Sequence, residues 1–203
     1  MVAGDGENSI VSLCKCADML NEHEAAGFAS ETSPADWLLL QGNLTKAATL
    51  AAMQTARGRV MLNAAPLRWP VVPMLAFCTV LVVNRGEAES ITGLADPDAA
   101  AMKLCAQGCA MAIVTLGANG CIWANAKGRG SLPAIAVHPL DTTGAGDTFC
   151  GVLVAHLASG MHVRDAVTAA QQAAALSVTR LGAYAALPTE AELGFLRQQL
   201  GAQ

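Results

Sequence analysis

Residues 141–149 read Asp-Thr-Thr-Gly-Ala-Gly-Asp-Thr-Phe and form a glycine-rich turn that enters a long helical pattern. Small residues in such a turn let the backbone approach a ligand, and the helix behind it presents free N–H groups and a positive dipole end. Gly144, Ala145 and Gly146 therefore form a candidate anion cradle, suited to the charge of a transferring phosphoryl group. Asp147, in the first helical turn, is placed to accept the proton of an attacking hydroxyl as a catalytic base.

A plainer interpretation of this stretch exists. The segment from Gly144 to Gly146 could be only a tight turn between a strand and a helix. Asp147 could be an acidic residue that the helix dipole favours in a first turn. The spacing of these residues does not by itself distinguish an anion cradle from a plain turn. Motifs elsewhere in the chain are needed to choose between the two interpretations.

Upstream of the turn, short apolar runs alternate with helical patterns. Buried strands are predicted at Trp37–Gln41, Arg59–Asn63, Thr79–Asn84 and Met111–Leu116. Helices are predicted between them at Thr45–Arg57 and Asp96–Gln107, and after the turn at Ala145–Ala158, Val163–Thr179 and Pro188–Leu200. Two further strands, Cys121–Ala124 and Ala134–His138, are expected to form a hairpin or sheet edge. Strands alternating with helices predict an α/β fold with a mostly parallel sheet.

The composition excludes several classes of partner. The chain has 203 residues, is 53% hydrophobic and carries a formal net charge of −4, with its twelve Lys and Arg residues scattered. We therefore expect neither nucleic acid nor a membrane as a partner. The acidic N-terminus does not resemble a secretory signal, which predicts a cytoplasmic protein. Seven cysteines in apolar segments, without zinc-site spacing, predict reduced structural thiols.

The stretch 141–149 resembles the C-terminal signature of the ribokinase-like (PfkB) family of carbohydrate kinases, in which the last aspartate is the catalytic base. A second motif supports this resemblance, because Asn84-Arg85-Gly86-Glu87 is similar to the family's Asn-x-x-Glu motif, which organises magnesium and phosphate. Mg²⁺ retains several waters in proteins, so Glu87 is expected to act on it largely through water. Taken alone, Asn84 would be interpreted as a helix cap and Glu87 as a solvated acid.

Two other segments resemble the nucleotide side of the family. The turn formed by Thr115, Leu116, Gly117, Ala118, Asn119 and Gly120 is similar to its ATP-contacting segment. Gln171 falls at an adenine-contacting position, and Gly146 and Asp147 complete the implied ATP-binding set. The resemblance also implies an activating K⁺ site at Asp141, Thr143, Ser177, Arg180 and Gly182, several acting through backbone carbonyls. Ala186 stands where the family often has Ser, which removes one candidate oxygen ligand.

On the substrate side, Asn43 matches a position that faces the sugar together with Asp147, and residues 63–66 resemble the family's Asn-Pro-Ala-Pro loop. Residues 4–11 resemble a lid strand, but residues 12–18 depart from the Gly-Ala-Asn that usually follows it. The family's first strands, most of its lid and a glycine-rich sugar motif come earlier still. The sequence contains none of these.

The resemblance implies a three-layer α/β/α ribokinase-like fold that is truncated at its N-terminus. Residues 1–12 would be a remnant of the lid strand, and residues 13–203 the nucleotide-binding and catalytic domain. The implied activity is transfer of the γ-phosphate of ATP to a sugar hydroxyl, with conversion of ribose to ribose 5-phosphate as the leading reaction. The alternative is a catalytically impaired, nucleotide-binding fragment, since a lid supplies much of a kinase's rate. An uncovered sheet edge also predicts poor solubility or self-association, for example as a homodimer.

Overall fold

The computed structural model describes the backbone of residues 15–201 and the side chains of residues 15–195. The predicted lid-strand remnant at residues 1–12 lies outside the described residues. Described residues up to Leu132 form one compact unit, and those from Pro133 form a second. We call them the sheet unit and the helical unit. The assignment of residues 13–203 to a single domain stays a prediction.

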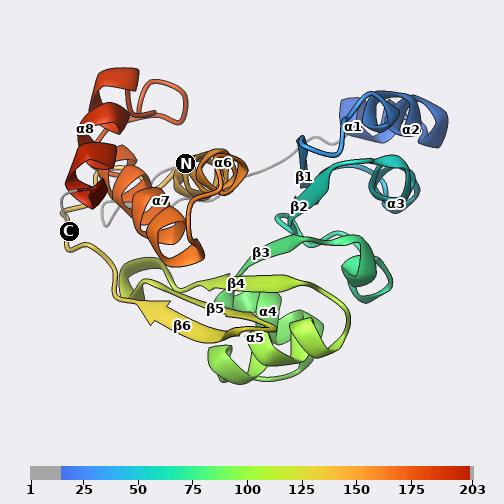
Figure 1. Cartoon of the computed structure of the whole chain (residues 1–203), viewed down its shortest axis with the longest axis horizontal. Helices are drawn as coiled ribbons and strands as arrows, with labels where there is room; N and C mark the ends of the chain where they lie inside the picture. Colours follow the sequence, from blue (N-terminus) through green and yellow to red (C-terminus); the bar gives the residue numbers. More distant parts are fainter. Residues whose placement is uncertain (1–14, 202–203) are drawn as a thin grey trace. The chain divides into compact units, whose positions relative to one another are not determined.

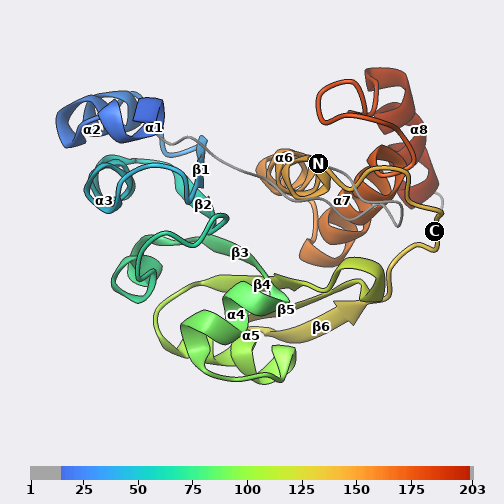
Figure 2. The same ribbon diagram turned by 180° about the vertical axis from the view of Figure 1, so that it is seen from behind.

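The sheet unit is built on one six-stranded sheet (Figures 1 and 2). In their order across the sheet, the strands are β1 (Trp37–Gln41), β2 (Arg59–Asn63), β3 (Val80–Asn84), β4 (Met111–Thr115), β5 (Cys121–Asn125) and β6 (Gly128–Leu132). Strands β1 to β4 are parallel, whereas β5 and β6 are antiparallel to their neighbours. The register pairs Gln41 with Asn63 and Asn84 with Thr115. The carboxyl ends of the parallel strands therefore lie along one end of the sheet.

Helices of the sheet unit begin where the sequence supplies a capping side chain. They are α1 (Lys15–Met19), α2 (Glu22–Ser30), α3 (Lys46–Thr55), α4 (Arg85–Thr92) and α5 (Pro97–Ala106), with 3₁₀ turns η1 (Val72–Phe77) and η2 (Gly117–Asn119). The side chains that cap α2, α3, α4 and α5 are Asn21, Thr45, Asn84 and Asp96. Each accepts a first-turn N–H that would otherwise lack a partner, which stabilises a helix by about 1 kcal/mol. These caps fix where each connecting helix starts.

One face of the sheet carries the helices of this unit. Alternate strand residues share a single hydrophobic core with α2, α3, η1, α4 and α5, and they include Leu40, Leu62, Leu81, Val83 and Val114. The intervening residues Met61, Val82 and Ile113 are buried as well. Strands buried on both faces are continuous apolar runs rather than alternating ones, as expected for a parallel sheet.

The helical unit consists of α6 (Ala145–Ala158), α7 (Val163–Ser177), α8 (Glu190–Gly201) and their connections. Helix α6 packs against α7, and α7 packs against α8 (Figures 1 and 2). Gly144 (φ 79°) precedes α6 and Gly160 (φ 82°) follows it. Both adopt the left-handed backbone conformation that glycine tolerates and that ends or begins a helix sharply.

The hairpin at the end of the sheet corrects one expectation. The prediction of a strand at Ala134–His138 is wrong, because residues 133–139 form no strand and β5 pairs with β6 at Gly128–Leu132. The two strands join through a two-residue turn in which Asn125 pairs with Gly128 (φ 136°). Trp123 lies directly against Gly130, where an added Cβ would come within 2.2 Å of the indole. The two-residue turn and Gly130 set the register of β5 against β6. Neither feature produces an alternating apolar pattern in the sequence.

The buried cysteines behave as small apolar side chains. All six cysteines in the described part of the chain are free, and Cys78, Cys109, Cys121 and Cys150 are buried. Burial raises the pKa of Cys109 and of Cys121 to about 12, so both remain thiols. Residues 15–201 contain no group of three His, Cys, Asp or Glu side chains able to hold a metal ion. These findings agree with the expected structural role of the thiols.

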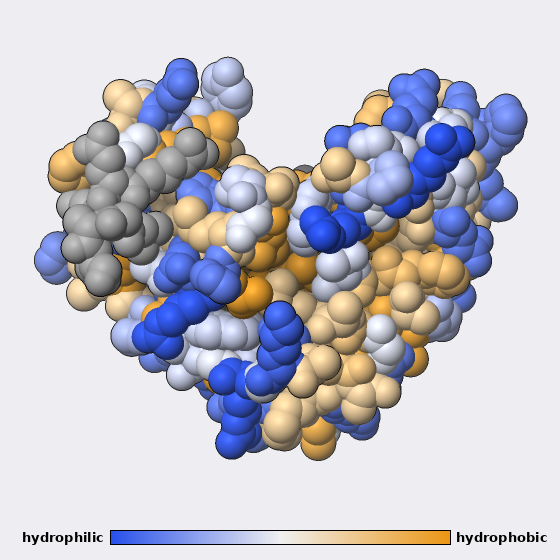
Figure 3. Space-filling view, in the orientation of Figure 1, coloured by the Kyte–Doolittle hydropathy of each residue, from blue (hydrophilic) through white to orange (hydrophobic). Residues whose placement is uncertain are grey.

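In Figure 3, hydrophilic residues are spread over several parts of the visible face. None of the described helices is long and apolar enough to span a bilayer.

Candidate active site

Asn84 and Glu87 form a capping box at the carboxyl end of β3. The Asn84 side chain accepts the Glu87 N–H at 2.8 Å, and a Glu87 carboxylate oxygen accepts the Asn84 N–H at 2.8 Å. Burial raises the pKa of the half-buried Glu87 carboxyl, and the Asn84 N–H partly opposes this shift. The family motif is thus also a helix cap. The capping hydrogen bond holds one Glu87 carboxylate oxygen. It thereby fixes the position of this carboxylate at the carboxyl end of β3.

The segment from Thr115 to Gly120 forms a tight connection between β4 and β5. The Leu116 N–H donates to the Gly120 carbonyl at 2.8 Å, and the Gly120 N–H donates to the Gly117 carbonyl at 3.0 Å. Gly117 (φ 56°) and Gly120 (φ 93°) take backbone conformations that favour glycine. Gly117, Ala118 and Asn119 are exposed. The predicted nucleotide-contacting turn is therefore a hydrogen-bonded loop that begins at Thr115, the residue paired with Asn84 on the neighbouring strand.

Asn43, the predicted substrate-side residue, follows β1 and is half-buried. The Gly42 N–H before it donates to the Ala65 carbonyl at 3.2 Å. A Cβ on residue 42 would lie 2.2 Å from the Pro66 carbonyl oxygen, so only glycine fits there without moving the backbone. The structure thus brings the Asn43 loop against residues 63–66, the two segments that the sequence assigned to the sugar side.

Two further side chains hold the Asn43 loop. The Arg68 guanidinium donates to the Asn43 carbonyl and pairs with the Asp18 carboxylate at 2.9 Å. The Trp69 Nε1–H donates to the Leu44 carbonyl at 3.0 Å. Sequence reasoning missed both residues, because nothing in the local pattern marks a long side chain that bonds a backbone 25 positions away.

In the helical unit, the Gly144–Asp147 stretch opens α6 as expected. The first helical hydrogen bond runs from the Thr148 N–H to the Gly144 carbonyl at 2.9 Å, so the helix does not use the Gly146 N–H. Gly146 is exposed, and a Cβ built on it would meet nothing within 4 Å. Asp147 is exposed in the first turn. The turn therefore carries an N–H donor, on Gly146, that the helix does not use, and the next residue in the chain is Asp147.

Asp141 connects this turn to the segment after α7. One oxygen of its buried carboxylate accepts the Thr143 N–H at 2.9 Å, and the other accepts the Gly182 N–H at 2.9 Å. The Thr143 hydroxyl and N–H, with the Gly182 N–H, hold the pKa of Asp141 below its ordinary value. We call this arrangement the Asp141 clasp. It keeps a negative charge at the base of the anion cradle.

The clasp brings together most of the residues predicted for K⁺. Thr143 and Gly182 bond Asp141 directly, and the Val178 carbonyl accepts the Asp141 N–H at 3.2 Å. Ser177 is buried, and its hydroxyl donates to the Ala174 carbonyl at 2.8 Å. Ala186, which replaces a candidate ligand, is also buried.

The remaining predicted residues of the helical unit are placed as follows. Arg180 directs its guanidinium to Glu192 on α8. Gln171 lies half-buried on α7, between Thr143 and Gly182 in the sequence. The candidate residues thus form two groups, with Asn43, Asn84, Glu87 and the Thr115–Gly120 turn in the sheet unit, and the others in the helical unit.

Comparison with known proteins identifies the class. The model of the pfkB family of carbohydrate kinases matches residues 1–190. Because this match covers most of the sequence, the chain belongs to the pfkB carbohydrate kinase family. Its relatives include the ribokinases of Mus musculus (31% identical over 206 residues, 95% of this chain) and Haemophilus influenzae (32% over 200 residues, 94% of this chain).

Solved structures give the same result. A ribokinase from Thermotoga maritima has a TM-score of 0.85 and 28% identity, covering 97% of this chain and 67% of its own. Aminoimidazole riboside kinase from Salmonella enterica, complexed with aminoimidazole riboside and an ATP analogue, has a TM-score of 0.70 and 26% identity over 82% of this chain and 64% of its own. These likenesses confirm the predicted three-layer α/β/α ribokinase-like fold. The chain spans 64% and 65% of the lengths of the mouse and Haemophilus relatives.

Proposed function

We propose that this chain carries the nucleotide-binding and catalytic part of an ATP-dependent sugar kinase, with ribose as its leading substrate and ribose 5-phosphate as the product. The observation that carries the proposal is the clasped turn at the start of α6. There Gly144, in a left-handed conformation, exposes the Gly146 N–H beside the Asp147 carboxylate. Resemblance to ribokinases favours ribose over other sugars.

In the proposed reaction, this turn supplies two groups, which are the Asp147 carboxylate and the Gly146 N–H. Asp147 accepts the proton of the sugar hydroxyl as its oxygen forms a bond to the γ-phosphorus of ATP. The bond between that phosphorus and the β–γ bridging oxygen breaks, and ADP leaves with the bonding electron pair. The Gly146 N–H and the N-terminal dipole of α6 stabilise the charge on the moving phosphoryl group.

A divalent cation fits the Asn84–Glu87 capping box. Mg²⁺, when bound, would neutralise charge on the ATP phosphates. The Asn84 N–H occupies one Glu87 carboxylate oxygen, and a neighbouring cation or its water would offset the burial that raises the pKa of this carboxyl. The described residues provide no cluster of carboxylates for direct coordination. We therefore assign Glu87 an outer role, in which it orients water on the cation.

K⁺ fits the Asp141 clasp. Asp141 stays ionised because three donors lower its pKa, and its two oxygens have about four lone-pair sites, which leaves about one beyond those donors. Hard cations take such carboxylate and carbonyl oxygens. Bound K⁺ would supply fixed positive charge next to the anion cradle. Asp141, Thr143, Ser177, Arg180 and Gly182 would hold it, mainly through backbone carbonyls.

The Glu87→Gln variant tests the outer role in metal binding. Glutamine preserves the capping box but removes the charge, so we expect the Mg²⁺ concentration for half-maximal turnover to rise about 10-fold. Titration of ADP formation against Mg²⁺ measures this. Glu89→Gln is the matched control, because Glu89 is an exposed acid on the same helix. An unchanged Mg²⁺ requirement in Glu87→Gln would leave the residue with its capping role alone.

A second candidate is a nucleotide-binding chain without turnover. ADP formation by the purified chain with ATP, Mg²⁺, K⁺ and a sugar panel led by ribose separates the two. Sugar-dependent ADP formation supports the kinase. ATP binding without ADP formation supports the second candidate.

We also propose that the chain self-associates, with a homodimer as the simplest form. Among the described residues, β1 pairs only with β2, and its Leu39 side chain is 39% exposed. An apolar strand at the end of the strand order favours contact with another chain. Light scattering during size-exclusion chromatography should show a mass above 20.7 kDa, and a monomer at that mass would contradict the proposal. The cytoplasmic location stays a prediction.

A further inference from the structure

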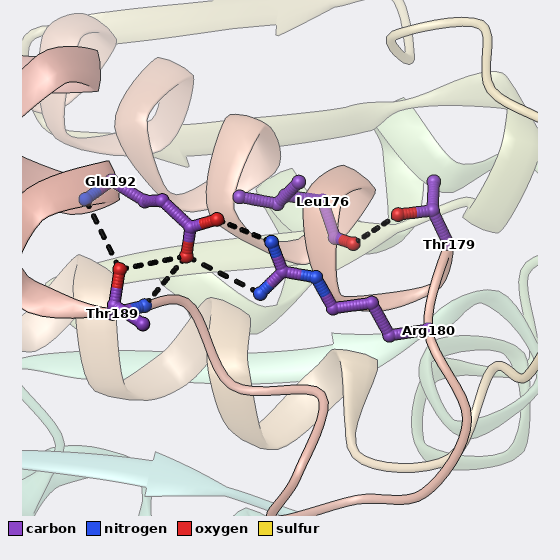
Figure 4. A network of polar contacts seen from close by, with 5 residues as sticks. All are labelled: Leu176, Thr179, Arg180, Thr189 and Glu192. Atoms are coloured by element: carbon purple, nitrogen blue, oxygen red, sulfur yellow. Dashed lines mark hydrogen bonds and ion pairs between the residues drawn. The ribbon is translucent and has the colours of Figure 1, made fainter.

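The side chain of Arg180 makes a two-point contact with Glu192 on α8 (Figure 4). Its Nη1 lies 3.3 Å from Glu192 Oε2, and its Nη2 donates to Glu192 Oε1. Both side chains are about one-third exposed, at 32% and 35%. Such a two-point contact fixes direction as well as distance, which a single ion pair does not.

Glu192 is itself held at the start of α8. Its Oε2 accepts the Thr189 N–H at 2.8 Å and the Thr189 hydroxyl at 2.9 Å, and the Glu192 N–H donates back to that hydroxyl at 3.3 Å. The Arg180 side chain, followed by Thr189, lowers the pKa of Glu192 to about 2. The carboxylate is therefore charged at neutral pH, and its position is fixed from two sides.

Arg180 lies in the segment that forms the Asp141 clasp. Two residues further on, the Gly182 N–H donates to the Asp141 carboxylate at 2.9 Å. Next to it, Ala183 packs against Gly144, where an added Cβ would lie 3.3 Å from the Ala183 Cβ. Displacement of this segment would therefore reach both the clasp and the first residue of the anion cradle.

We propose that the Arg180–Glu192 pair is a positioning pair that anchors residues 179–183 to α8 and thereby holds Gly182 and Ala183 against Asp141 and Gly144. This assigns the Arg180 side chain a role separate from the backbone carbonyl suggested for K⁺. A partly exposed ion pair contributes little to global stability. Its loss should therefore loosen this segment rather than unfold the unit.

The direct test is hydrogen exchange at the Gly182 amide in the full chain. In Arg180→Met and in Glu192→Gln, we expect exchange at Gly182 to become about 10-fold faster, because the segment opens more often. Arg180→Lys retains charge but only one contact, and it should fall between these variants and the wild type. Thr189→Ala is the matched control, because it removes the cap hydroxyl of α8 but retains the N–H of residue 189 that Glu192 accepts and both Arg180–Glu192 contacts. In that variant, exchange at Gly182 should stay within about 2-fold of the wild type.

Steady-state kinetics provide a second test of the positioning pair, and this test rests on the proposed function. Arg180→Met and Glu192→Gln should lower kcat about 10-fold while the KM for the sugar changes little, since misplacement affects the reacting groups. Wild-type protein without ADP formation would count against the kinase and leave the exchange test intact. Unchanged Gly182 exchange in the pair variants would overturn the positioning role. Equal acceleration in Thr189→Ala would also overturn it, because the pair would then act only through folding of α8.

Discussion

The Asp147→Asn variant should lose about 10²–10⁴-fold in sugar-dependent ADP formation, the range over which a positioned general base contributes. Asparagine keeps the size of the side chain but cannot take the hydroxyl proton. Because Asp147 is exposed in the first turn of α6, the substitution should leave folding almost unchanged. A coupled assay for ADP, with ATP binding measured in parallel, separates lost chemistry from lost binding.

Asp165→Asn provides the matched control for this result. Asp165 is also an exposed acid in the first turn of a helix, in this case α7, and no proposed step involves it. Its variant should retain wild-type turnover. If Asp147→Asn kept more than about one-tenth of wild-type activity, Asp147 would be only a favourable first-turn acid.

The Gly144→Ala variant should lose about 10- to 10²-fold in turnover, because the first residue of the anion cradle would move. A Cβ at this position meets the Ala183 Cβ at 3.3 Å and the Ala183 Cα at 3.4 Å, so one of the two segments must shift. The positive φ of 79° adds a conformational cost of about 1–2 kcal/mol for alanine. Urea unfolding measures the second effect, and ADP formation measures both.

Gly160→Ala isolates the conformational cost. Gly160 has a similar φ of 82° just after the other end of α6, and an added Cβ meets nothing within 4 Å. The two variants should therefore lose comparable stability, and only Gly144→Ala should lose turnover. Equal turnover in both would show that contact with Ala183 does not shape the cradle.

The fold was largely predictable from local pattern. Predicted and observed strands coincide at Trp37–Gln41 and Arg59–Asn63, and helix α6 coincides at Ala145–Ala158. In these segments, a short apolar run of strand length or an uninterrupted helical pattern next to glycine leaves one reasonable choice. The predicted strand at Ala134–His138 failed because a short apolar run does not by itself ensure a pairing partner. Among the described residues this segment pairs with no strand, and Ile135 is 42% exposed.

The candidate site could be predicted only where one short motif contains the interacting residues. Asn84 and Glu87 are three positions apart, and Thr189 and Glu192 share the same capping spacing, which makes both contacts visible in sequence. Asp141 and Gly182 lie 41 positions apart, and no local pattern connects them. Such long-range contacts depend on how α6 and α7 pack, so only the structure reveals the clasp.

The boundary after Leu132 has an optical consequence. The three tryptophans, Trp37, Trp69 and Trp123, all precede that boundary, whereas the single tyrosine, Tyr184, follows it. Indole fluorescence therefore originates only in the sheet unit, while far-ultraviolet circular dichroism detects the helices of both units. A melting curve followed by tryptophan emission reports on the scaffold that carries Asn84 and Glu87. The helices that carry Asp147 contain no tryptophan.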